Sequence, residues 1–103
     1  MPKPHHIMLT TLLLAGCTDG DISKARAVVK GNLNDADSAQ FRNERVYRVN
    51  GGTTVCGEVN AKNLMGGYMG FQQFSVDEGV VMNMGDGAVL DCQFAEVNSR
   101  LEK

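Results

Sequence analysis

Chemically versatile side chains are concentrated in one short stretch of the sequence. It contains a carboxylate, an ammonium group, two amides and a phenol, which belong to Glu58, Asn60, Lys62, Asn63 and Tyr68. The neighbouring glycines would let a ligand approach the backbone closely, so these side chains are candidates for a pocket that binds a sugar, a peptide or a small anion. The alternative is structural: Asn and Gly supply left-handed turn conformations while Glu58 and Lys62 pair across the bend. The sequence leaves both open.

The amino terminus has the order of residues found in a bacterial export signal. Lys3 precedes a short apolar run from Ile7 to Leu14, which is too short for a transmembrane helix. The run leads into Leu14-Ala15-Gly16-Cys17, which resembles the lipobox of bacterial lipoproteins. The resemblance implies that diacylglycerol is attached to the Cys17 thiol and that the chain is cleaved before it. Residues 1–16 are then removed, 17–20 form the lipid anchor and a short tether, and 21–103 fold as one small domain.

The residue after the acylated cysteine predicts where the protein resides. Two acyl chains anchor a protein stably, so the membrane is a partner through the lipid on Cys17. In the lipoprotein sorting rule of enteric bacteria an Asp at the next position retains the protein at the inner membrane, whereas Thr18 releases it. We therefore expect the outer membrane, facing the periplasm. Asp19 follows directly, which leaves the inner membrane as the alternative.

The cysteine count becomes meaningful once Cys17 is assigned to lipid. Of the 3 Cys, Cys56 and Cys92 remain, and the oxidising envelope favours a disulfide between them. Two separately buried thiols are the alternative. Cys56 alternates with Val55 and Val59, so if these valines face the helices Cys56 faces the other side of its strand. The disulfide then requires the closing segment to cross to that side, or the valines to face outward.

Histidine is absent from the expected mature part, because the 2 His are His5 and His6. This excludes Ser-His-Asp and Cys-His catalysis and zinc sites that contain histidine. We predict no enzyme, no metal site and no cofactor. Four of the 6 Met, namely Met65, Met69, Met82 and Met84, offer soft thioether ligands for Cu(I), although methionines more often fill irregular cores.

Composition and charge narrow the class of protein further. Hydrophobic residues make up 43% of the chain and charged residues 21%, which is typical of a globular domain. The formal net charge is -2, so no basic field exists to collect phosphates, and we expect no nucleic-acid partner.

The elements that must position these residues follow from the apolar patterns. Helical spacing of Ile22, Ala25, Val28, Val29 and Leu33 predicts a helix capped by Asp19 or Asp21, and Asn34 can cap a second short turn. Strands are predicted at 46–49, 53–59, 68–76 and 80–84, with a hairpin turn at Gly51-Gly52.

The last segment is ambiguous, because Leu90, Phe94, Val97 and Leu101 fit a helix whereas residues 88–94 could form a strand. We favour the helix. The predicted fold is α+β, with one or two helices packed on one face of a three- to four-stranded antiparallel meander.

Two segments carry a resemblance. One reads Asp35-Ala-Asp-Ser-Ala-Gln-Phe-Arg-Asn43, and the other is Val55-Cys-Gly-Glu-Val-Asn-Ala-Lys-Asn-Leu-Met-Gly-Gly-Tyr-Met-Gly-Phe71. Together they resemble a set of small, functionally uncharacterised proteins of proteobacteria and their phages. The resemblance covers roughly the middle half of the chain and implies relatives, not a reaction.

These observations lead to two functional hypotheses of different classes. The first is a non-enzymatic, envelope-anchored lipoprotein that binds or modulates another envelope component, with an envelope protein as its partner. The second is a periplasmic module that binds a small ligand or Cu(I).

Overall fold

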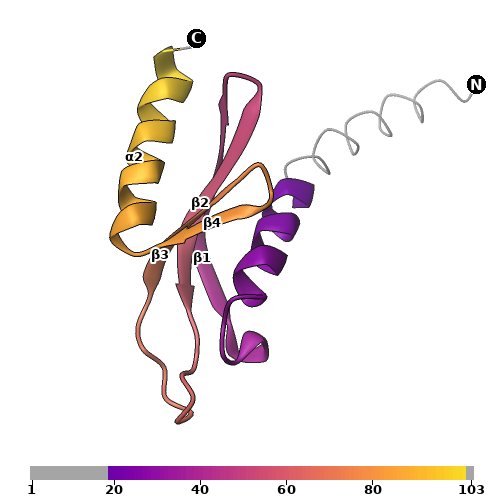
Figure 1. Cartoon of the computed structure of the whole chain (residues 1–103), viewed down its shortest axis with the longest axis vertical. Coiled ribbons are helices and arrows are strands. Elements are labelled where there is room, and N and C mark those ends of the chain that lie inside the picture. Colours follow the sequence, from indigo (N-terminus) through magenta and orange to yellow (C-terminus); the bar gives the residue numbers. More distant parts are fainter. Residues whose placement is uncertain (1–18, 102–103) are drawn as a thin grey trace, which may run out of the picture.

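The computed structural model describes residues 19–101, so the export segment and Cys17 lie outside the described residues. The described chain has three layers: a four-stranded antiparallel sheet with one helix on each face (Figure 1). Residues 19–30 are helical and are called the N-terminal helix below. The other elements are η1 (Ala36–Ser38), β1 (Gln40–Val49), β2 (Gly52–Asn60), β3 (Gln72–Asp77), β4 (Val81–Met84) and α2 (Asp86–Leu101).

The sheet is the predicted meander, with strand order β1-β2-β3-β4 and each strand antiparallel to the next. The α+β prediction is therefore confirmed. The first hairpin turns at Asn50 and Gly51, whose φ angles of 52° and 79° are both left-handed. Two such residues give the backbone twist that matches a pair of right-twisted strands. The turn lies one residue earlier than predicted, because Gly52 already pairs with Val49.

Strand β1 begins earlier than its sequence pattern indicated. The apolar residues Phe41 and Val46 do not alternate with period two, but a register shift between Arg42 and Arg45 returns both to the same face. Asn43 has a φ of 55° within this irregularity. Only the three residues of η1 remain of the short turn expected after Asn34, and β3 begins at Gln72 instead of residue 68.

The main hydrophobic core lies between the sheet and the N-terminal helix. Its fully buried members are Ala25, Val29, Val55, Val59, Phe74 and Val76. The rings of Phe41 and Phe74 meet edge to face, with centroids 5.8 Å apart. Gly57 makes room for the second ring, because a Cβ atom on Gly57 would lie 2.9 Å from the ring of Phe74.

Helix α2 covers the other face of the sheet, which corrects the expectation that the helices share one face. Its buried residues are Ala88, Cys92 and Ala95. Cys92 forms the predicted disulfide with Cys56, with Cα atoms 6.1 Å apart. The closing segment is thus a helix, and it crosses to the side of β2 opposite Val55 and Val59.

Candidate functional site

The β2–β3 loop, residues 61–71, contains most of the side chains that the sequence singled out. It lies at the end of the sheet opposite the carboxyl terminus (Figure 1). Asn63 organises its backbone: the Oδ1 atom accepts hydrogen bonds from the amides of Met65 and Gly67 at 2.9 and 3.1 Å. The amide of Asn63 also donates to the carbonyl of Gly67 at 2.9 Å. The loop is therefore ordered by its own contacts.

A second set of hydrogen bonds attaches this loop to η1. The hydroxyl of Tyr68 donates to the carbonyl of Ser38 at 3.0 Å, and the amide of Lys62 donates to Ser38 Oγ at 2.9 Å. Across the base of the loop, the amide of Gly70 donates to Asn60 Oδ1 at 3.0 Å. Asn60, Asn63 and Tyr68 therefore stabilise the conformation of the loop, which is the role that the structural alternative gave to its Asn residues.

Glu58 lies apart from this group, so the pairing of Glu58 with Lys62, which was part of the structural alternative, does not form. Its carboxylate accepts hydrogen bonds from Asn43 Nδ2 at 2.6 Å and from Arg42 Nε at 3.1 Å. The Asn43 amide and then the Arg42 guanidinium hold the pKa of Glu58 below its ordinary value of 4.5. A carboxylate that stays ionised at neutral pH is a poor proton donor. Lys62 instead places its ammonium 5.7 Å from the centre of the Tyr68 ring.

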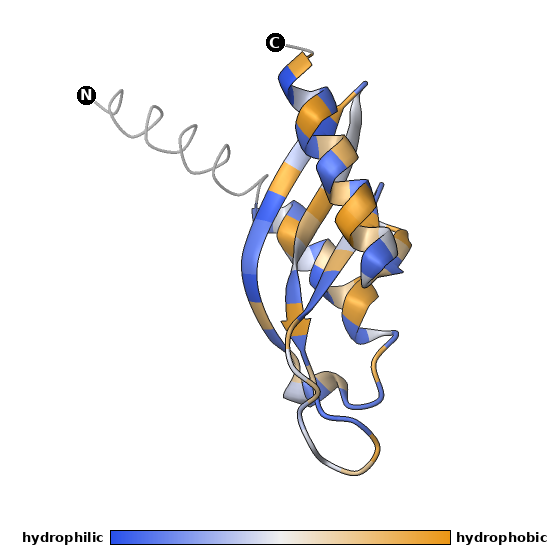
Figure 2. Cartoon of the chain, turned by 90° about the vertical axis from the view of Figure 1, so that its left-hand side faces the viewer, coloured by the Kyte–Doolittle hydropathy of each residue, from blue (hydrophilic) through white to orange (hydrophobic). Residues whose placement is uncertain are grey.

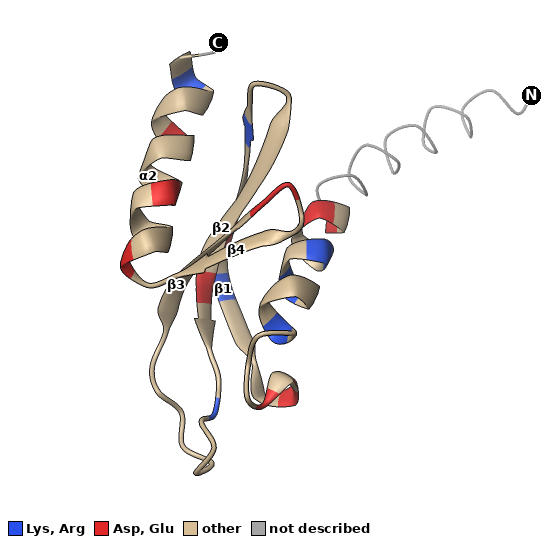
Figure 3. Cartoon of the chain, in the orientation of Figure 1, with Lys and Arg blue, Asp and Glu red and all other residues tan. Residues whose placement is uncertain are grey.

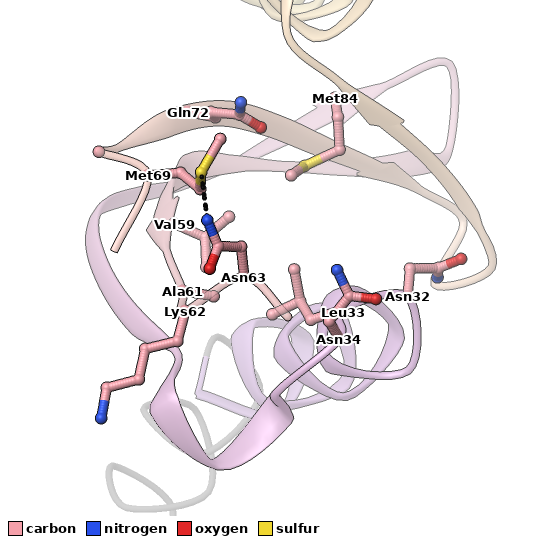
Figure 4. A pocket seen from close by; sticks show the side chains of 11 residues that line it. Asn32, Leu33, Asn34, Val59, Ala61, Lys62, Asn63, Met69, Gln72 and Met84 are labelled. Carbon is pink, nitrogen blue, oxygen red and sulfur yellow. Dashed lines mark hydrogen bonds between the residues drawn. The ribbon is translucent and has the colours of Figure 1, made fainter. Parts of the chain in front are cut away.

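A cavity of about 220 Å³ opens between the loop, the end of the N-terminal helix and β4 (Figure 4). Of the five predicted ligand-binding residues, only Lys62 and Asn63 line it, and the ammonium of Lys62 points away from it (Figure 4). The remaining lining residues are Asn32, Leu33, Asn34, Val59, Ala61, Met69, Gly70, Gln72 and Met84. The sequence did not indicate the amide side chains of Asn32, Asn34 and Gln72 as parts of one site, because they come from segments that only the fold brings together.

The methionines lie in different environments. Met82 and Met84 pack against the core, whereas Met65 at the tip of the loop is 93% exposed. Met69 and Met84 line the same cavity, and Met69 Sδ accepts a hydrogen bond from Asn63 Nδ2 at 3.1 Å. Within residues 19–101 there is no group of three or more His, Cys, Asp or Glu side chains that could hold a metal ion.

Two carboxyl groups at the contact between α2 and the sheet were not indicated by the sequence. Asp77 Oδ1 accepts a hydrogen bond from the Thr54 hydroxyl at 2.6 Å, and the Asp91 carboxyl is its close neighbour. Burial, with the nearby negative charge of Asp91 and Glu78, raises the pKa of Asp77 above 3.8, although the Thr54 hydroxyl acts in the opposite direction. Asp91 Oδ2 is buried and has no hydrogen-bond partner among the described residues.

Figure 3 marks Lys and Arg on the N-terminal helix and on β1. Two of these basic residues pair with acidic residues of the first half of the chain. Arg26 pairs with Glu44, and Arg48 Nη2 lies 2.8 Å from Asp21 Oδ2. Asp21 therefore bonds to β1 from within the helix, whereas the sequence suggested it as a helix cap. These pairs are partly exposed, and such pairs contribute little to stability.

Among the described residues, apolar side chains are exposed in three places. One is the tip of the β2–β3 loop, where Leu64 is 86% and Met65 93% exposed. The second is the turn between β3 and β4 with the start of β4, where Val80 is 72% and Val81 56% exposed. The third is the outer face of α2, where hydrophobic residues recur along the helix (Figure 2). Exposed apolar groups that gather on one surface are typical of interaction sites.

No family model, curated protein or solved structure matches the chain. Among the described residues, none of the helices is long and apolar enough to span a bilayer.

Proposed function

We propose that this chain is a non-enzymatic bacterial lipoprotein of the envelope that binds or modulates another envelope component through its β2–β3 loop. The observation that carries the proposal is the contrast between the ordered loop backbone and the exposed Leu64 and Met65 at its tip. A loop already held in one conformation loses little entropy on binding. Burial of each apolar side chain against a partner would contribute roughly 1.5 to 3 kcal/mol.

The position of the loop suits a protein anchored at Cys17. Only Thr18 separates Cys17 from the helical residue 19, so a lipid on Cys17 would hold this end of the domain next to the membrane. The loop lies at the end of the sheet away from residue 19 (Figure 1). It would therefore point away from the membrane and into the periplasm. Thr18 after the acylated cysteine makes the outer membrane the expected membrane.

The two segments that resemble proteobacterial and phage proteins contact each other. Ser38 of the first bonds to Tyr68 of the second, and the Arg42 guanidinium lies 3.6 Å from the centre of the Phe71 ring. Arg42 also pairs with Glu58. The two segments therefore form one structural unit, which consists of the β2–β3 loop and the parts of η1 and β1 that contact it. This favours the loop as the part that relatives would use in common.

The residue types favour binding over catalysis. From Cys17 onward the chain has no histidine, and the pKa of Glu58 is lowered, which leaves it ionised at neutral pH. Three of the remaining polar side chains of the predicted site, those of Asn60, Asn63 and Tyr68, are engaged in hydrogen bonds within the loop and to η1. A partner would therefore contact mainly the apolar side chains of Leu64 and Met65 and the backbone of the loop.

Photo-crosslinking in living cells tests the proposal. The full chain, expressed in a Gram-negative bacterium with a benzophenone side chain at Met65, is expected to give a discrete adduct with one envelope component. Asn63→Ala should weaken that adduct, because it removes the acceptor that orders the tip. Val80, 72% exposed in the turn between β3 and β4, is the matched control position. No adduct at Met65, or the same adducts at Val80, would contradict the proposal.

The cavity supports a second candidate function, binding of a small ligand or Cu(I). The specific observation is that two thioethers, Met69 and Met84, line it together with several amides. Mass spectrometry of the full chain with Cu(I) is expected to show one bound ion, which Met84→Leu would remove. Absence of a stoichiometric adduct in the unmodified chain would exclude the metal.

A further inference from the structure

Two carboxyl groups, those of Asp77 and Asp91, meet at the contact between β3 and α2. Asp77 is the last residue of β3, and the hydroxyl of Thr54 on β2 donates to its Oδ1 atom at 2.6 Å. Asp91, in the second turn of α2, is within hydrogen-bonding reach of Asp77. Its Oδ2 atom is buried, and no donor among residues 19–101 reaches it. Because a buried oxygen without a donor is costly, a proton on one of the two carboxyl groups would supply what this contact lacks.

The charges around Asp77 are negative. Glu78, in the turn after β3, and Asp91 both act on it with like charge. The strands on either side place a hydroxyl, an apolar side chain and a phenol in register with this end of β3. They belong to Thr54 on β2, Val81 on β4 and Tyr47 on β1. Within the part of the chain that the structure describes, neither Asp77 nor Asp91 forms an ion pair with a basic side chain. Two ionised carboxylates would therefore repel each other here, and partial burial reduces the screening by water.

We propose that Asp77 and Asp91 share one proton and that this proton fastens α2 to the sheet. One carboxyl group then donates to the other, so the buried oxygen of Asp91 has a partner and the pair carries one negative charge instead of two. Burial, with the charges of Asp91 and Glu78, raises the pKa of Asp77, which agrees with a proton held at this contact. Release of the proton leaves two carboxylates opposed between helix and sheet, which weakens the packing of α2.

The disulfide keeps the two carboxyl groups together. Cys92 follows Asp91 directly and is bonded to Cys56 on β2, with Cα atoms 6.1 Å apart. Asp91 therefore stays near the sheet while the disulfide is intact, so the repulsion is relieved either by binding of a proton or by local opening of the helix. Opening is favoured in the first turns of α2, residues 86–91, because they precede the disulfide and bury only Ala88.

The raised pKa of Asp77 gives the direction of the pH effect. The closed contact holds the proton more firmly than the open one, so the proton's contribution is complete below pH 3.8, the ordinary pKa of an aspartate. It is lost as the pH rises through the raised pKa. Between these two values the equilibrium constant for opening should rise by up to about tenfold per pH unit, because opening releases one proton. Acid therefore fastens α2, and a higher pH loosens it.

Hydrogen exchange followed by NMR tests the effect on α2. In the full chain in mild detergent, the amides of residues 90–95 bond to the carbonyls of the first turns, and their opening constant should rise with pH. Asp77→Asn and Asp91→Asn should each remove this dependence, because an amide donates to the remaining carboxylate at any pH. Asp86→Asn, which alters an exposed carboxylate at the start of the same helix, is the matched control and should keep the dependence.

An NMR titration of the carboxyl carbons in the unmodified chain tests the shared proton itself. The carbons of Asp77 and Asp91 should shift together in two steps, since interacting groups titrate as a pair. Separate single-step titrations would overturn the proposal. So would opening of α2 that is independent of pH in the parent, or that remains dependent on pH in both Asn variants. Because the titration needs no substitution, it decides the question even where a variant does not fold.

Discussion

At the scale of single residues, the packing of α2 against the sheet changes the pKa of the Asp77 carboxyl group, which lies next to Asp91. Asp77 lies on β3 beneath α2, where burial removes water from its carboxylate and Asp91 adds a like charge nearby. Both effects favour the protonated form, which raises the pKa of Asp77. The Thr54 hydroxyl, at 2.6 Å, offsets part of this by donating to the ionised form.

Asp77→Asn should therefore stabilise the domain at neutral pH. The raised pKa means that the folded state binds a proton more readily than the unfolded state, so the native domain gains stability as the pH falls through the folded pKa. This gain in stability is complete below pH 3.8, because 3.8 is the ordinary pKa of an aspartate. Urea unfolding should show the advantage of Asp77→Asn at pH 7 and its loss in acid.

Asp37→Asn, at an exposed position in η1, is the control and should change the urea midpoint little. A variant at Asp77 that is less stable than the parent at pH 7 would contradict the argument from burial.

At the scale of elements, α2 is attached to the sheet through small side chains and a disulfide. Its buried side presents two alanines and Cys92, and small side chains bury little apolar surface. The Cys56–Cys92 disulfide links α2 to β2 across 36 positions of sequence. On the chain-entropy account, closure of a loop of this length contributes about 4 kcal/mol. The disulfide is thus a major part of what keeps α2 in place.

Cys92→Ser should lower the free energy of unfolding by roughly 2 to 5 kcal/mol. Because the disulfide is the main link of α2, amide hydrogen exchange should accelerate most strongly in residues 86–101 and less in β1–β3. Reduction of the unmodified chain should reproduce both effects, which separates loss of the bond from the substitution itself. Equal unfolding midpoints for the oxidised parent and Cys92→Ser would contradict this interpretation.

At the scale of the whole molecule, exposed apolar side chains lie on separate elements: the tip of the β2–β3 loop, the turn between β3 and β4, and the outer face of α2. A partner bound only to the tip of the loop would therefore leave the apolar side chains of α2 exposed.

Lipidation of Cys17 can be measured directly. Cys17→Ala should abolish labelling with palmitate, because the thiol is the proposed site of acylation. Globomycin, which inhibits signal peptidase II, should make the full-length precursor accumulate. Processing that is indifferent to both treatments would show that the lipobox-like sequence does not function as one.

Much of the architecture could be predicted because local patterns determine it. The alternation around Val55 and Val59 and the hairpin signal at Gly51-Gly52 predict an antiparallel meander, and the periodicity from Leu90 to Leu101 predicts a helix. Cysteine arithmetic identified the pair Cys56 and Cys92, since assignment of Cys17 to lipid left two candidates. These inferences depend on neighbours in sequence, or on residue counts alone.

The arrangement of faces was decided only by the tertiary structure. Periodicity shows which residues of α2 share a side, but not which side the sheet will cover, and here the small side chains allow the close approach that the disulfide needs. Asn60, Asn63 and Tyr68 could have faced a ligand. Instead Asn63 bonds to backbone amides of its own turn, whereas the fold brings the Gly70 amide to Asn60 and the Ser38 carbonyl to Tyr68. The cavity joins amides from three distant segments, because burial and hydrogen bonding depend on contacts between residues that are remote in sequence.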